Sequence, residues 1–170
     1  IHMRGKVCTV SLDSSGKPLN QRGYRVQTNI APINEVLAAG IIQLSEWNCD
    51  SDLLDPMCGS GTFLIEAAMI AKNYPPNYSR NNFLFQNWKD FDVELFDSIK
   101  KSVIGKIKKI NFKIYGYDRS HSTVKKAVLN IKEAGFENYI SVKKEDFFNT
   151  KKDFDKKLYL IFNPPYGERL

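Results

Sequence analysis

A short apolar segment, a glycine-rich turn and a helix-forming run follow one another between residues 52 and 71. Asp52-Leu53-Leu54-Asp55-Pro56 is typical of a short buried strand that ends in an acidic turn. Met57-Cys58-Gly59-Ser60-Gly61-Thr62 forms the turn, and residues 63–71 are apolar on nearly every side and rich in strong helix formers. Strand, glycine turn and helix bring a backbone close to a nucleotide-like ligand, because glycines lack the Cβ atoms that would obstruct it. The segment therefore predicts an α/β fold with a ligand at this turn.

The residues around the turn discriminate between nucleotide ligands. A phosphate-binding P-loop requires a lysine after its last glycine, but Thr62 follows Gly61. A dinucleotide fingerprint requires a third glycine at the position of Leu64, which disfavours a nicotinamide-dependent oxidoreductase. The carboxylate of Asp55 repels pyrophosphate but suits a cation with ribose hydroxyls. The turn therefore favours S-adenosylmethionine as the cofactor.

Two later strands also end in acidic residues. The run 112–118 ends at Asp118, which we expect to bind the ribose hydroxyls of the cofactor. The run 139–148 contains Asp146 and Phe147, which we expect to accept from the adenine amine and to pack on the ring. Each aspartate could instead cap a helix or lie in a solvated turn. Their recurrence at successive strand ends favours a shared ligand site.

The fourth apolar run, residues 158–162, leads into Asn163-Pro164-Pro165-Tyr166. The Asn side-chain oxygen and a backbone carbonyl can both accept from one NH₂ group, and the Tyr ring can stack on a base. The two prolines fix φ, so the loop is stiff before anything binds. We assign Asn163, Pro164, Pro165 and Tyr166 as catalytic residues that hold a target amine.

Four segments carry a resemblance to a known family: residues 22–25 (Arg-Gly-Tyr-Arg), 31–35 (Ala-Pro-Ile-Asn-Glu), 54–62 and 163–170. The chain resembles, from about Ser11 to Leu170, the bacterial large-subunit ribosomal RNA guanine methyltransferases that carry a THUMP RNA-binding domain. Such proteins are also described as adenine-specific DNA methylases because they share Asn-Pro-Pro-Tyr. The resemblance implies a Rossmann-like class I methyltransferase fold. Together with the motifs it assigns these cofactor-binding residues: Pro32, Asp55, Pro56, Cys58, Gly59, Gly61, Thr62, Asp118, Asp146, Phe147 and Asn163.

The same resemblance sets the expected domain organisation. Residues 1–30 are expected to hold a tag remnant (Ile1-His2-Met3) and a strand over 4–12 from the upstream THUMP region. Residues 31–170 are expected to form the N-terminal part of the methyltransferase domain, with an insertion at about 74–111. Four core strands are found where the family sheet has seven. The sequence therefore predicts a sheet truncated after the fourth core strand, in a fragment that is inactive on its own.

The helices of this region are also predicted from the pattern. Pro32 suits the first turn of a helix that runs to about Trp47, with Val36, Leu37, Ile41 and Leu44 on its buried face. Further helices are expected over 93–109 and 119–134, the second ended by Gly135. The aromatic residues of the insertion could stack nucleobases, but we favour the interpretation that they fix the insertion to the sheet.

Composition limits the partners and the compartment. The 170 residues carry a net charge of +6 with a pI near 9.1, which fits a polyanion such as ribosomal RNA or, equally, a solvated lysine-rich surface. No apolar run is long enough to span a membrane. Cys8, Cys49 and Cys58 lack the spacing of a disulfide framework or a zinc site, so we expect a cytoplasmic protein without metal.

These observations predict methyl transfer from S-adenosylmethionine to the exocyclic amine of a guanine in large-subunit ribosomal RNA. An adenine-amine-specific DNA methyltransferase is the nearest alternative, because the amine of adenine fits the same Asn-Pro-Pro-Tyr loop. A non-catalytic nucleic-acid-binding module of the same fold is the second alternative.

Overall fold

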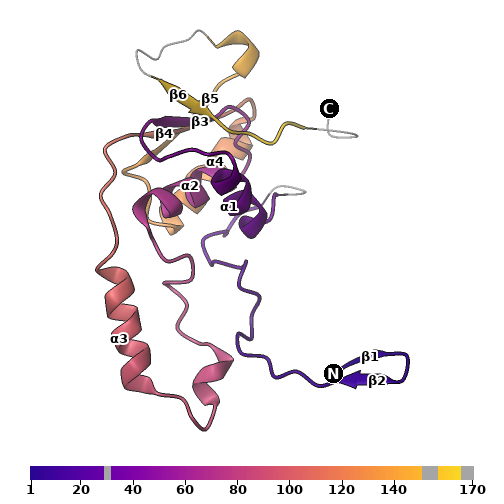
Figure 1. Cartoon of the computed structure of the whole chain (residues 1–170). Coiled ribbons are helices and arrows are strands. Elements are labelled where there is room, and N and C mark those ends of the chain that lie inside the picture. Colours follow the sequence, from indigo (N-terminus) through magenta and orange to yellow (C-terminus); the bar gives the residue numbers. More distant parts are fainter. Residues whose placement is uncertain (29–31, 151–156, 166–170) are drawn as a thin grey trace.

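The computed structural model describes residues 1–28, 32–150 and 157–165. Its centre is a parallel sheet in the order β5-β4-β3-β6 (Figure 1). The strands are β3 (Asp52–Asp55), β4 (Ile114–Asp118), β5 (Ile140–Lys144) and β6 (Leu158–Leu160). The strand order reverses between β3 and β6, and ligands of open α/β sheets bind outside the carboxyl ends of the strands at such a point. The predicted α/β architecture and the four predicted strands are confirmed.

Helices cover one face of this sheet. The helices α2 (Thr62–Lys72) and α4 (His121–Glu133) pack on β4 and β5, and α1 (Glu35–Leu44) packs on α2 (Figure 1). Gly135, with φ of +74°, follows α4 as predicted. Nine of the eleven residues of α2 are buried, which agrees with its apolar composition. The helix that follows the glycine turn is therefore the central element of the core.

A glycine in β4 permits close contact between the sheet and α2. A Cβ atom at Gly116 would lie 2.4 Å from Leu64 Cδ1 and 3.1 Å from Cys58 Sγ. The first distance is far below van der Waals contact, so any larger residue would push α2 and the glycine turn away from the strand. The position of the turn therefore depends on Gly116, whose role the sequence alone did not indicate.

The α1 helix differs from the prediction in length and in its buried face. It begins after Asn34, whose side chain accepts from the backbone N–H groups of Val36 and Leu37, and it ends at Leu44. Glu35, Ala38 and Ile42 are its buried residues, whereas Val36, Leu37 and Leu44 are exposed. Of the predicted buried face, only Ile41 packs on the core, where it is partly buried. The prediction is wrong for the other three residues because the Asn34 cap and the ion pair between Glu35 and Arg25 (3.5 Å) turn Glu35 inward.

The N-terminal segment is a hairpin rather than a single strand. The strands β1 (His2–Arg4) and β2 (Val7–Thr9) pair antiparallel, and all of their residues are exposed. Gly5, with φ of +60°, reverses the chain between them. The prediction of one strand over residues 4–12 is therefore wrong.

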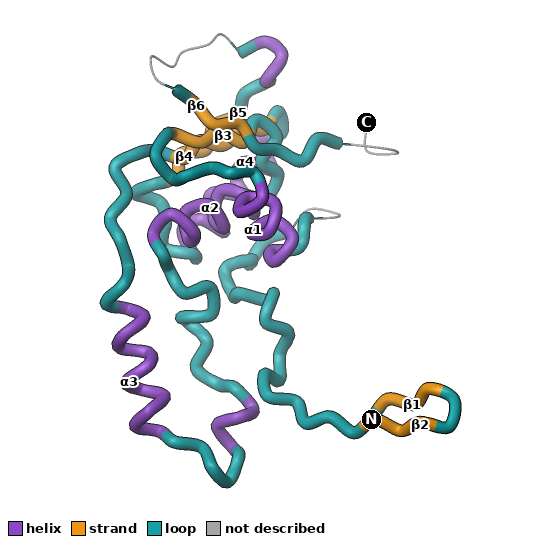
Figure 2. The backbone as a smooth tube through the Cα atoms, viewed as in Figure 1, coloured by secondary structure: helices purple, strands orange, loops and turns teal. Residues whose placement is uncertain are grey.

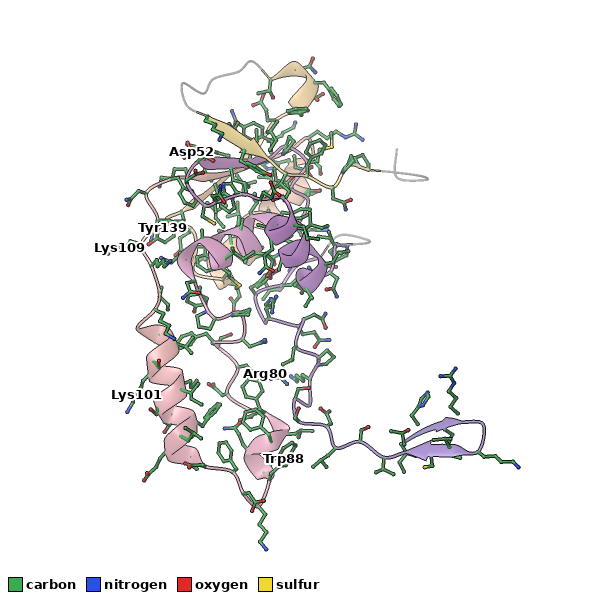
Figure 3. All side chains as sticks on the ribbon, in the orientation of Figure 1. Asp52, Arg80, Trp88, Lys101, Lys109 and Tyr139 are labelled. Carbon is green, nitrogen blue, oxygen red and sulfur yellow. The ribbon has the colours of Figure 1, made fainter. Side chains whose placement is uncertain are left out.

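The insertion between α2 and β4 contains the short 3₁₀ helix η1 (Leu84–Asn87) and the helix α3 (Val93–Ile104). It lies away from the sheet (Figure 2), and the labelled side chains of Trp88 and Lys101 mark its distant part (Figure 3). The predicted helix over 93–109 therefore ends earlier, at Ile104, after which Gly105 caps it.

Aromatic rings of the insertion contact one another instead of the sheet. The contacts join Phe83, Phe85, Phe91 and Phe96 at centroid distances between 5.1 and 6.3 Å. The interpretation that these aromatics fix the insertion to the sheet is wrong for this cluster, because α3 gives the rings a closer apolar surface. Tyr74, at the base of the insertion, does pack on a core ring, that of Phe136 (5.4 Å). Within the described ranges, no helix has the length and hydropathy that crossing a bilayer requires.

Candidate functional site

The carboxyl ends of the four parallel strands meet at one edge of the sheet and border a single pocket. The pocket has a volume of about 450 Å³, within the range of small-molecule sites. Residues predicted for the site form much of its wall: Pro32, Asp55, Pro56, Cys58, Gly59, Thr62, Asp118, Asp146, Phe147, Asn163, Pro164 and Pro165. Residues that come from strand ends over a hundred positions apart are thus brought together.

The glycine turn forms the floor of the pocket and is fixed to the end of β4. The N–H of Cys58 donates to the carbonyl of Tyr117 (2.8 Å), and the N–H of Gly59 donates to Asp118 Oδ2 (3.2 Å). Gly59 and Gly61 have φ of +54° and +87°, a backbone conformation that favours glycine. Gly61 is the N-cap of α2 and does not itself line the pocket. Its contribution is therefore the shape of the turn.

The Asp118 carboxylate is oriented by the backbone. Oδ2 accepts from the N–H of Gly59 and Oδ1 accepts from the N–H of Ser120 (2.8 Å). Each carboxylate oxygen has two lone-pair sites, so both retain acceptor capacity toward a ligand in the pocket. This geometry suits hydrogen bonds from a pair of neighbouring hydroxyl groups, such as those of a ribose.

Asp55 lies deeper, with 1% of its surface exposed. Burial raises its pKa to about 7, and the nearby Asp118 charge acts in the same direction, while a hydrogen bond from the N–H of Met57 (3.0 Å) opposes them. A ligand cation beside Asp55 would favour the charged carboxylate. Burial also raises the pKa of the Cys58 thiol well above its usual value, which is unsuited to a nucleophile.

Asp146 and Phe147 form the wall that follows β5. Asp146 caps the short 3₁₀ helix η2 (Phe147–Asn149), because its Oδ1 accepts from the N–H of Phe148 (3.1 Å). Asp146 therefore has the capping role that was the alternative to ligand binding, and it also lines the pocket. The Phe147 ring lies 6.4 Å from that of Phe162, which connects this wall to the end of β6.

The loop after β6 completes the pocket. The residues of this loop that line it are Asn163, Pro164 and Pro165. They are far from the glycine turn in the sequence but line the same pocket. Tyr166 and residues 167–170 lie outside the described residues, so the predicted stacking role of Tyr166 stays a prediction.

Several residues that support the site were not predicted. Glu66, buried within α2, accepts from Arg22 (3.0 and 3.2 Å) and from the Tyr24 hydroxyl (2.9 Å). Arg25 donates to the carbonyl of Ile33 (2.7 Å) and to Thr62 Oγ1 (3.0 Å), both of which line the pocket. The sequence does carry a signal for Glu66, because a lone carboxylate inside an apolar helix requires a hydrogen-bonding or charged partner.

Asn130 of α4 joins the N-terminal segment to the glycine turn. Its Oδ1 accepts from the N–H groups of Val26 and Gln27, and its Nδ2 donates to the carbonyls of Gln27 (2.8 Å) and Ser60 (3.0 Å). Only 1% of the Asn130 surface is exposed, and these hydrogen bonds satisfy both polar atoms of its side-chain amide. No sequence signal distinguishes this asparagine from a solvent-exposed one.

The pocket suits an organic cation with hydroxyl groups better than a phosphate or a metal ion. Its lining contains four carboxylates (Asp55, Asp118, Glu145 and Asp146) and one cation, Arg119. Among the described residues, no group of three or more His, Cys, Asp or Glu is placed to hold a metal ion. Phe63 and Phe147 add apolar surface to the lining.

Comparison with known proteins follows the same lines. The family of RMKL-like methyltransferase domains matches residues 22–170. The chain is 43% identical over 167 residues to the ribosomal RNA large subunit methyltransferase K/L of Vibrio cholerae, covering 95% of this chain and 23% of that protein. It spans about a quarter of the length of the curated relatives that it matches.

Solved structures of related proteins share the fold. A candidate methyltransferase complexed with SAH superposes with a TM-score of 0.84 at 39% identity, over 93% of this chain and 41% of that one. A predicted N6-adenine-specific DNA methylase from Listeria monocytogenes superposes with a TM-score of 0.81 at 32% identity, with the same coverage. Pocket, sheet order and sequence therefore agree, and the chain belongs to the family of RMKL-like methyltransferase domains.

Proposed function

We propose that this chain is the cofactor-binding part of an S-adenosylmethionine-dependent methyltransferase, which acts on the exocyclic amine of a guanine in large-subunit ribosomal RNA. One observation carries the proposal: Asp55, Asp118, Asp146 and the Asn163-Pro164-Pro165 loop border one pocket of about 450 Å³. Carboxylates for a cationic, ribose-bearing donor thus lie beside acceptors for an amine. Relatives named as ribosomal RNA methyltransferases support the substrate class.

The chemistry of the pocket residues supports S-adenosylmethionine as the cofactor. Asp118, whose oxygens keep acceptor capacity, would bind the ribose hydroxyls. Asp146 would accept from the adenine amine and Phe147 would pack on the ring, while Asp55 and the glycine turn would face the rest of the molecule. When bound, S-adenosylmethionine supplies a methyl group activated by a sulfonium.

Asn163 and the adjacent prolines would act on the second substrate. The lone pair of a guanine amine is delocalised into the ring, which makes the amine a poor nucleophile. Acceptance of its two N–H bonds by Asn163 Oδ1 and the Pro164 carbonyl would draw the nitrogen toward tetrahedral geometry and stabilise its developing positive charge. Positioning of this kind can contribute about 7–11 kcal/mol to lowering a barrier. The target base has to leave its stack, at a cost of about a few kcal/mol.

An adenine-amine-specific DNA methyltransferase remains a second candidate, because the amine-binding groups suit adenine equally and one structural relative is described as such. A non-catalytic nucleic-acid-binding module is a third. The deciding experiment is radiolabelled methyl transfer by the natural protein to ribosomal RNA and to DNA, followed by nucleoside analysis. We expect label in a methylated guanosine from ribosomal RNA.

The Asn163→Ala variant is the control for that experiment. It should abolish methyl transfer and leave the affinity for S-adenosylhomocysteine, measured by calorimetry, nearly unchanged. Label in methyladenine from DNA would support the second candidate. An absence of cofactor binding by the wild-type protein would support the third.

A further inference from the structure

Phe148 lines the pocket although 82% of its surface is exposed. Single exposed apolar residues are ordinary on protein surfaces and need no special explanation. Phe148 differs from such residues because it lines the pocket that Asn163, Pro164 and Pro165 also line. A large aromatic side chain is thus presented to solvent at the pocket that contains the groups that we assign to the target amine.

The backbone that carries this ring is braced. Asp146 Oδ1 accepts from the N–H of Phe148 (3.1 Å), and Asp146 Oδ2 accepts from Asn149 Nδ2 (3.1 Å). The Thr150 hydroxyl donates to the carbonyl of Asp146 (2.8 Å). The Phe147 ring contacts the Phe148 ring at 5.7 Å. These contacts fix the turn, so a partner that stacks on Phe148 meets a surface whose position is set in advance.

The lining residues of the pocket differ in solvent exposure, which distinguishes a buried floor from an exposed rim. Asp55, Cys58 and Thr62 are 1%, 6% and 4% exposed and form the floor, where a cofactor would lie. Phe148 is at the opposite extreme and forms part of the rim. A ligand that fills the floor leaves the outer part of the Phe148 ring uncovered, so the molecule that covers it has to approach from outside.

We propose that Phe148 is a stacking platform for an unpaired nucleobase of the RNA substrate that neighbours the target nucleotide. The inference rests on the proposed function and names a further contact of the same site. Every base has a π-face, so an exposed aromatic ring binds single-stranded nucleic acid without selecting its sequence. A target base that has left its stack also leaves its neighbour with one uncovered face, which Phe148 can cover.

The adenine ring of the cofactor is the competing occupant. Phe147, the preceding residue, is only partly exposed and offers a ring of the same kind closer to the floor. The two adjacent phenylalanines therefore form a matched pair: removal of Phe147 should weaken cofactor binding, and removal of Phe148 should weaken RNA binding.

The test uses the natural protein and its Phe148→Ala, Phe148→Trp, Phe147→Ala and Trp88→Ala variants. Trp88 is an exposed aromatic of the insertion, 42% exposed and far from the sheet (Figure 3). Affinity for a labelled, unmodified fragment of large-subunit ribosomal RNA is measured by fluorescence anisotropy with S-adenosylhomocysteine present, so that no turnover occurs. Affinity for S-adenosylhomocysteine alone is measured by calorimetry.

We expect Phe148→Ala to weaken RNA binding by about ten-fold or more and to leave cofactor affinity within about two-fold. Phe148→Trp should restore RNA affinity, Trp88→Ala should leave it unchanged, and Phe147→Ala should weaken cofactor binding. The proposal would be overturned if Phe148→Ala lost cofactor affinity and kept RNA affinity, or if it kept both affinities. An equal loss of RNA affinity in Trp88→Ala would also overturn it. RNA affinity that depends on Phe148 in a protein without methyl-transfer activity would refute the proposed function and support this site.

Discussion

The glycine-turn region (residues 52–73) and the insertion (residues 74–111) follow each other in the chain but are stabilised in different ways. In α2 nine of the eleven residues are buried, whereas the described helices of the insertion, η1 and α3, contain no buried residue. The first region packs between the sheet and α1, and the buried carboxylate of Glu66 is paired with Arg22. The second is held by aromatic rings that contact one another. A destabilising substitution in the first region should therefore affect the unfolding of the whole domain, whereas one in the second region should affect only the insertion.

The largest effect is expected for Arg22→Met. The side chains of Arg22 and Glu66 are 9% and 2% exposed, so removal of the cation leaves a buried carboxylate that keeps its hydrogen bond from the Tyr24 hydroxyl. Loss of one member of such a pair costs about 3–5 kcal/mol. Chemical denaturation should show this loss, and Lys101→Met, at an exposed position of α3, should change the free energy of unfolding by less than about 0.5 kcal/mol. Similar losses in both variants would remove the contrast between the regions.

Asp55→Asn should produce an effect that depends on pH. Because the folded-state pKa of Asp55 is raised to about 7 from 3.8, the folded protein binds more protons than the unfolded chain between these values. Its contribution to stability is therefore complete below pH 3.8 and is lost as the pH rises toward 7. The variant, which keeps the oxygen that accepts from Met57, should gain on the order of 4 kcal/mol relative to the wild type between pH 4 and pH 7.5. A difference that does not vary with pH would show that Asp55 titrates normally.

Gly116→Ala should be next in size. The new Cβ would lie 2.4 Å from Leu64 Cδ1, and such overpacking costs about 1–3 kcal/mol. Gly40→Ala in α1 is the matched control, since nothing lies within 4 Å of its added Cβ and alanine favours the helix by about 1 kcal/mol. Thermal unfolding should shift in opposite directions for the two variants. A stabilised Gly116→Ala protein would contradict the close approach of α2 to β4.

The smallest effect is expected in the insertion. Phe85→Leu removes ring contacts with Phe83, Phe91 and Phe96, which contribute about 0.5–1.5 kcal/mol per aromatic pair. Hydrogen exchange should become faster in α3 and remain unchanged in β3 and β4. Faster exchange in the sheet strands would mean that the insertion and the core unfold together.

Local patterns in the sequence predicted the elements that depend on local chemistry. The strand, glycine turn and helix over residues 52–71 are found as expected, as are the acidic residue that ends β4 and those that follow β5, because turn residues and hydrophobic runs specify them directly. Contacts between distant segments were not predictable in this way. Arg22 meets Glu66, and Asn130 meets Val26, across 44 and 104 residues, and their side chains have no periodic pattern.

Errors arose where a tertiary contact decided between local alternatives. The inward rotation of Glu35 depends on Arg25, so the apolar residues of α1 alone gave the wrong buried face. The prediction that the aromatic residues of the insertion make apolar contacts is correct, but these rings pack on one another instead of on the sheet. The roles of the pocket residues in binding and catalysis stay predictions until the ligands are tested.

The attachment of α1 at both ends determines how a ligand can enter. Arg25 ties the segment before α1 to Thr62, and the Tyr159 hydroxyl of β6 donates to the carbonyl of Ser45, just after α1. The Pro32 side and the Asn163 side of the pocket are therefore both attached to α1, and they cannot move apart unless one of these hydrogen bonds breaks. Small molecules should therefore enter and leave past the η2 turn, where the Phe148 side chain on the pocket rim is 82% exposed, without any movement of α1.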